Sequence, residues 1–80
     1  MPETLYSLGK TASLEGDSTS AEKAWKKVVE LEKDGNLAAQ AHFGLAGIYR
    51  KQGKAEAADR EMEEFKKQQN SGVANEQQQP

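Results

Sequence analysis

The chain repeats one pattern of residues after an interval of 37 positions. The first copy contains Leu8-Gly9, Ala12, Gly16, Ala21, Trp25 and Val28, and the second contains Leu45-Ala46, Tyr49, Gly53, Ala58, Met62 and Phe65 at identical spacings. A repeat of this length is typical of architectures in which each supersecondary unit buries its apolar face against a neighbouring unit. The pattern therefore predicts a stack of two similar units, and it favours a binding surface over an enzyme.

Length and composition narrow the function further. The 80 residues suffice for one small domain without a large enclosed pocket, and a net charge of −2 does not suggest nucleic-acid binding. The absence of cysteine excludes a disulfide framework and a thiolate metal site. Apolar runs are only a few residues long and no secretory signal is visible, so we expect no membrane insertion. The compartment is unknown from the sequence, and a soluble, cytoplasmic protein is favoured.

The spacing of apolar residues predicts four helices and a polar tail. The predicted helices run from Glu3 to Glu15, from Thr19 to about Asp34, from Asn36 to about Gly53, and from about Lys54 to about Gln69. Thr19 with Glu22 matches a capping box, and Asn36 can cap the third helix. Residues 71–80 have almost nothing to bury, so we expect a disordered tail, with a linker to a further domain as the alternative.

These residues and spacings resemble the tetratricopeptide repeat, a helix-turn-helix unit of about 34 residues. The first repeat covers about 2–35 and the second about 39–72, within a domain at 2–70 that is followed by the tail at 71–80. The resemblance implies an all-α fold of four antiparallel helices in a short right-handed α-solenoid. It also implies that the chain is a scaffold for protein–protein interaction.

Small and large residues alternate where the helices of a unit should meet. Gly9 and Ala46 allow close approach, and Trp25 and Met62 then fill the space beside them. His42 has no second histidine or cysteine with which to share a metal, so we expect a half-buried packing residue. The sequence has no nucleophile with a base, no phosphate-binding loop and no metal spacing, which predicts neither catalysis nor a cofactor.

In the family, the first helix of each unit lines a concave groove that holds a peptide or a partner helix. Opposite the expected core stripe of Leu5, Leu8 and Ala12, helical geometry places a second face. Its candidate binding residues are Tyr6, Lys10 and Ser13 on the first helix, and Gln40, Phe43, Gly47 and Arg50 on the third. Cations beside aromatic rings suit an acidic peptide or one bound by its C-terminal carboxylate. The alternatives are solvated cations and a Phe43 ring that packs on a neighbouring helix.

Two units are fewer than the three that usually make a self-sufficient stack. Met62 and Phe65 on the last helix are therefore expected to form an apolar open edge. Such an edge can be covered by further repeats of a longer array, by self-association as a homo-oligomer, or by a partner protein. Gly44 and Gly47 in the third helix indicate either close approach by a peptide backbone or tight helix packing.

Overall fold

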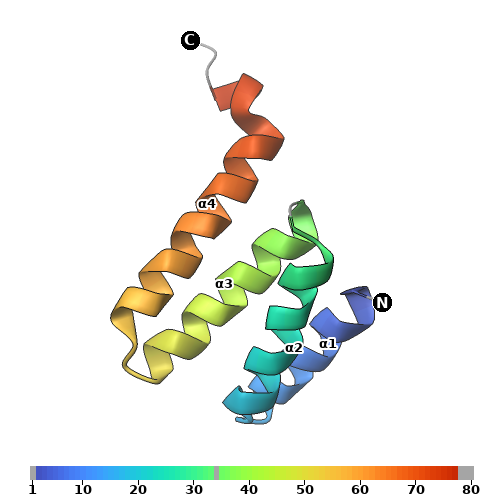
Figure 1. Ribbon diagram of the computed structural model, residues 1–80, viewed down its shortest axis with the longest axis vertical. Coiled ribbons are helices and arrows are strands. Elements are labelled where there is room, and N and C mark those ends of the chain that lie inside the picture. The colour runs from blue at the N-terminus through green and yellow to red at the C-terminus, as the bar shows by residue number, and fades with distance from the viewer. Residues whose placement is uncertain (1, 34, 78–80) are drawn as a thin grey trace.

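The computed structural model describes residues 2–33 and 35–77, with side chains as far as Gln68, and these residues form four helices (Figure 1). The helices are α1 (Pro2–Leu14), α2 (Ser18–Leu31), α3 (Asn36–Lys51) and α4 (Ala55–Gln77). The described residues contain no strand, and none of their helices is both long and apolar enough to cross a bilayer. The predicted all-α fold of two helix pairs is confirmed.

Both helix pairs turn in the same way. Gly16 and Gly53, which lie 37 positions apart, have positive φ angles of 84° and 77°, a region that glycine adopts without steric cost. In each turn, the amide after the glycine donates to the carbonyl five residues earlier at 2.8 Å. The repeat in the sequence is therefore also a repeat of backbone geometry.

The starts of the helices differ in detail from the sequence prediction. Asp17 is the N-cap of α2, and its Oδ1 accepts a hydrogen bond from the Ser20 amide at 3.1 Å. Hydrogen bonding to Ser20 lowers the pKa of Asp17 below its ordinary value. The predicted capping box of Thr19 and Glu22 is wrong, because the helix begins before Thr19 and the Asp17 carboxylate takes the capping role. Asn36 is the first residue of α3 rather than its cap.

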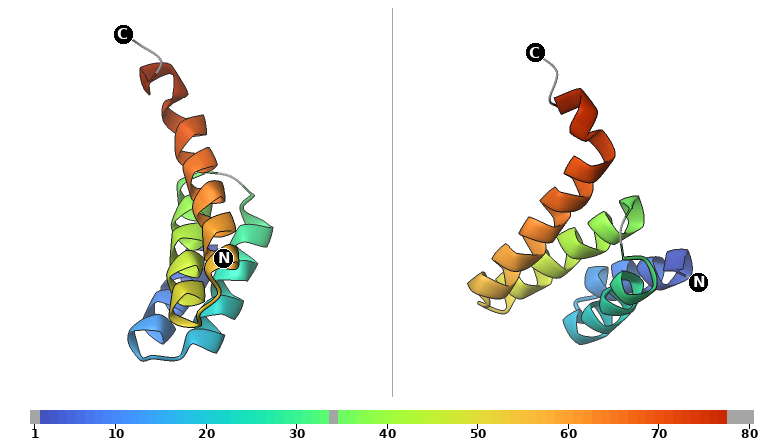
Figure 2. Two further views of the ribbon diagram at one scale, coloured as in Figure 1. Left: turned by 90° about the vertical axis from the view of Figure 1, so that its left-hand side faces the viewer. Right: turned by 45° about the horizontal axis from the view of Figure 1, so that its top comes forward.

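The last helix is longer than the sequence predicted. It continues beyond Gln69 to Gln77, and its final turns extend past the N-terminal end of the antiparallel helix α3 (Figures 1 and 2). Residues 71–77 of the expected disordered tail therefore have a helical backbone, and residues 78–80 lie outside the described residues. The segment includes alanine, glutamate and glutamine, which favour helix, and it contains no proline.

The central helix is α3, which packs against both α2 and α4 and also contacts α1. Among the described residues, by contrast, no Cα atom of α2 lies within 8 Å of one in α4. Because of its several neighbours, α3 buries eight residues, whereas α1 buries only Gly9. The helices α1 and α3 are therefore adjacent and present neighbouring faces.

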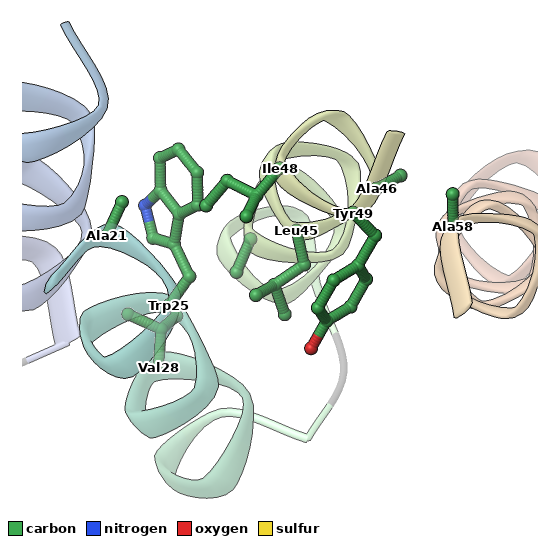
Figure 3. Close-up of a cluster of buried hydrophobic side chains, with 9 residues drawn as sticks. Ala21, Trp25, Val28, Leu45, Ala46, Ile48, Tyr49 and Ala58 are labelled. Carbon is green, nitrogen blue, oxygen red and sulfur yellow. The ribbon is translucent and has the colours of Figure 1, made fainter. Parts of the chain in front are cut away.

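Trp25 of α2 links the first three helices. Its indole lies between Gly9 of α1 and Gly44 of α3, so closely that a Cβ atom on either glycine would fall 2.5 or 2.6 Å from the nearest ring atom. The indole Nε1 also donates to the Tyr6 carbonyl at 3.1 Å. Figure 3 shows the ring beside Ile48 of α3. The prediction that a small residue at Gly9 permits close packing is confirmed.

The α3–α4 contact is built from smaller side chains. Ala46 and Ala58 face each other across it, each 1% exposed (Figure 3), and Met62 packs at the margin of the core. His42 is buried, and its Nδ1 lies 2.6 Å from Oε1 of Glu61. His42 is thus more buried than the half-buried packing residue that we expected, and it forms a polar link between the two helices.

Candidate functional site

The predicted binding residues lie on the two adjacent helices α1 and α3. We call the surface made by these seven residues the inner face: Tyr6, Lys10, Ser13, Gln40, Phe43, Gly47 and Arg50. Helix α1 supplies the first three and α3 the other four. Because α1 packs against α3, the two sets lie on neighbouring helices.

Each aromatic ring of the inner face rests on an aromatic ring of the second helix in its pair, which we call the outer helix: α2 in the first pair and α4 in the second. Tyr6 is half-buried and stacks on Trp25, with the ring centroids 5.9 Å apart. Phe43 lies 5.2 Å from Phe65 in a tilted arrangement, yet 55% of its surface is exposed. Phe43 therefore packs on a neighbouring helix, as one of the two interpretations of the sequence expected, and most of its surface stays exposed.

The rest of the inner face consists of two exposed cations, a glycine whose backbone is accessible, and two polar side chains. Lys10 and Arg50 are exposed, and among the described residues neither forms an ion pair within 4.0 Å. At Gly47 no heavy atom lies within 4 Å of the position that a Cβ atom would occupy. Ser13 and Gln40 are half-buried and contribute a hydroxyl and an amide. Hydrogen-bonding groups, positive charge and an exposed ring are thus all present.

A polar network that the sequence analysis missed joins α2 to α3. The Tyr49 hydroxyl donates to Oε2 of Glu22 at 3.1 Å, and Nζ of Lys26 lies 3.1 Å from the same oxygen. The Lys26 ammonium lowers the pKa of Glu22, and the Tyr49 hydroxyl adds to that effect. Burial raises the pKa of Tyr49, and the neighbouring Glu22 raises it further. Helical spacing reveals the face on which Glu22 lies but not its partner on another helix.

The open edge expected at Met62 and Phe65 is partly closed. Both residues are half-buried, since Met62 packs against the core and Phe65 against Phe43. The large apolar residues exposed in the described part of the chain are Leu8, Leu14, Leu31 and Phe43. Three of these four belong to α1 and α2. Among the residues whose side chains the structure describes, the exposed large apolar residues therefore lie mainly on the first helix pair.

Leu8 departs from the predicted core stripe. It is 57% exposed, whereas Leu5 and Ala12 are half-buried. Its counterpart Leu45 is 2% exposed because α3 packs against α1, α2 and α4, whereas α1 contacts only α2 and α3 among the described helices. Leu8 consequently points away from the core, and the prediction of a buried Leu8 is wrong.

A metal site would need several ligands in one place. Within the residues that the structure describes, no group of three or more histidine, cysteine, aspartate or glutamate side chains is arranged to hold a metal ion. The hydrogen bond between His42 and Glu61 joins α3 to α4.

Comparison with family models matches residues 2–34 to the tetratricopeptide repeat. The matched segment contains α1, the first turn and α2, and the residue pattern and turn geometry of this segment recur in the second helix pair. Comparison with curated proteins and with solved structures gave no match.

Proposed function

We propose that this chain, a member of the tetratricopeptide repeat family, binds an acidic peptide of a partner protein along its inner face. Repeats of this family generally mediate protein–protein interactions. The peptide would lie across α1 and α3 and be held by the seven inner-face residues, with the Phe43 ring as its apolar anchor.

The exposed ring of Phe43 is the observation that carries the proposal. The helix that bears it buries eight other residues, yet this phenylalanine keeps 55% of its surface accessible. An aromatic ring in such a position is costly to leave in water and is a common anchor for ligands. Its support from Phe65 at 5.2 Å limits its freedom, so less entropy is lost when a ligand packs against it.

The charges favour an acidic ligand. Lys10 and Arg50 project from neighbouring helices without a carboxylate partner within 4.0 Å among the described residues. Charge-assisted hydrogen bonds from such cations to carboxylates are stronger than neutral ones. The open space above Gly47 lets a peptide backbone approach α3 closely. An extended peptide with a C-terminal carboxylate or acidic side chains can pair with these cations and pass close to the backbone at Gly47.

Binding of a C-terminal peptide library by fluorescence anisotropy tests this proposal. Peptides with acidic residues and a free C-terminus should bind, and the charge-reversal pair Lys10→Glu with Arg50→Glu should weaken binding at least tenfold. Phe43→Ala should also weaken binding, because the apolar anchor is lost. Binding should decrease as salt concentration rises, since exposed charges are screened.

The matched control is Lys33→Glu with Lys66→Glu, which makes the same change of charge at two exposed lysines outside the inner face. This control should bind as the unmodified chain does. Equal losses in both pairs would reduce the effect to overall charge and would exclude the inner face as the binding site. Unchanged affinity in the Lys10 and Arg50 pair would exclude it as well.

A further inference from the structure

A groove between α1 and α2 lies outside the inner face. It has a volume of about 560 Å³, and we call it the end groove. Its lining consists of Leu5, Leu8, Thr11, Ala12 and Glu15 of α1 together with Ser20, Lys23, Ala24 and Lys27 of α2. The floor is apolar, and two lysines stand at the α2 side.

The internal repeat shows which kind of element fits this groove. A shift of 37 positions converts Leu5, Leu8, Thr11 and Ala12 into His42, Leu45, Ile48 and Tyr49. In the second repeat these four residues are all buried. Ile48 lies beside Trp25 of α2 (Figure 3) and Tyr49 binds Glu22 of α2, whereas His42 bonds to Glu61 of α4. The α1 side of the end groove therefore corresponds to the side of α3 that, one repeat later, packs against α2.

The chain carries a second outer helix that can occupy the groove of another molecule. The side of α2 that covers α3 includes Glu22, which binds Tyr49, and Trp25, which contacts Gly44. The same shift of 37 positions converts these two residues into Asp59 and Met62 of α4. The side of α4 that bears Asp59 and Met62 is thus equivalent to the side by which α2 packs against α3.

Charge distinguishes this arrangement from a symmetric one. The end groove carries Lys23 and Lys27, of which Lys27 also lies 3.7 Å from Glu30 in an exposed ion pair. The exposed residues of α4 include the carboxylates of Asp59 and Glu63 as well as the cations of Arg60, Lys66 and Lys67. Two end grooves placed against each other would bring lysines against lysines, whereas α4 brings carboxylates to them.

We propose that the end groove binds α4 of a second copy of this chain, so that molecules associate head to tail. The contact is heterologous, and a further copy can add at each end. One helix in one groove is a small interface, so the association is weak and appears at high protein concentration. This surface is separate from the inner face, and the two proposals can fail independently.

Sedimentation velocity of the full chain, from about 10 µM to about 1 mM, tests the association. The weight-average mass should rise with concentration. Leu8→Glu should hold the chain at the monomer mass, because it places a charge on the apolar floor of the groove. Leu14→Glu is the matched control, since Leu14 is an exposed leucine of the same helix that does not line the groove, and it should associate as the unmodified chain does.

A charge swap identifies the partner surface. Lys23→Glu with Lys27→Glu, and separately Asp59→Lys with Glu63→Lys, should each weaken self-association at least tenfold, and an equimolar mixture of the two variants should restore it. A monomer mass over the whole range, or equal behaviour of Leu8→Glu and Leu14→Glu, would overturn the proposal. Full association of the Asp59 and Glu63 variant alone would overturn the assignment to α4. Melting curves followed by circular dichroism verify that each variant is folded.

Discussion

The two helix pairs share one turn geometry but fill their interiors differently. The first pair encloses the indole of Trp25, which also reaches Gly44 of the next repeat, whereas the second brings Ala46 against Ala58 with Met62 at the margin. The repeat spacing thus fixes the path of the backbone, while the side chains at equivalent positions set how each interior is filled. A large ring beside a glycine in one pair corresponds to a flexible side chain beside an alanine in the other.

The largest difference between the pairs should appear when their filling residues are truncated. Trp25 is 5% exposed, and its ring contacts both α1 and α3. Trp25→Ala should therefore lower the free energy of unfolding by about 3–5 kcal/mol. Met62→Ala removes a half-buried side chain and should cost about 1–2 kcal/mol. Urea titrations followed by circular dichroism measure both. Equal losses would contradict the view that the first repeat depends more on its filling residue.

Substitution of alanine for each of two glycines of α3 should change the free energy of unfolding in opposite directions. Gly44→Ala should destabilise by about 1–3 kcal/mol, because its new methyl group would meet the indole of Trp25, which has Gly9 on its other side. Gly47→Ala should stabilise by about 0.5–1 kcal/mol, since its methyl group meets open space and alanine favours helix. Thermal melting of the two variants provides the comparison. A stabilising Gly44→Ala would show that the indole has room to move.

The polar pair of the second repeat can be exchanged for its apolar counterpart in the first. Positions 42 and 61 correspond to Leu5 and Ala24. Glu61→Ala alone should cost about 1–3 kcal/mol, because it leaves the buried His42 without a partner. Adding His42→Leu should recover most of that loss, since both polar groups are then absent. A double-mutant cycle measures the coupling, and strictly additive effects would exclude it.

The smallest predicted effect is a dependence on alkaline pH that arises from Tyr49, at whose equivalent position the first repeat has Ala12. Burial raises the pKa of Tyr49 above its ordinary value of 10.0, so its contribution is complete below pH 10.0. That contribution is lost as the pH rises through the raised pKa. Tyr49→Phe should therefore show a shallower fall of the unfolding midpoint above pH 10.0 than the unmodified chain. Parallel falls would exclude Tyr49 as the titrating group.

The sequence was sufficient for the helix order, the shared turns and the role of Gly9, because all three follow from local spacing. It did not predict the exposure of Leu8, since that exposure depends on which side of α1 has no neighbouring helix. It also missed the bonds from Glu22 and Glu61 to residues of α3, because contacts between helices leave no local signal. The replacement of Leu5 and Ala24 by His42 and Glu61 between repeats was the visible sign of the second bond.

The position of the inner face was predictable from helical geometry, but the support beneath its rings was not. Stacking of Tyr6 on Trp25 and of Phe43 on Phe65 depends on residues 19 and 22 positions further along the chain. These contacts make the core and the candidate binding surface parts of one structure. A change at Trp25 should therefore affect both repeats.

Denaturation followed by two signals tests this coupling most directly. Trp25 is the single tryptophan, so its fluorescence reports on the first repeat and its contact with α3, while far-ultraviolet circular dichroism reports on all helices. Because the indole is held between Gly9 and Gly44, the two signals should give the same midpoint and slope in urea. A fluorescence transition that separates from the loss of helix would contradict the account and show that the two repeats unfold independently.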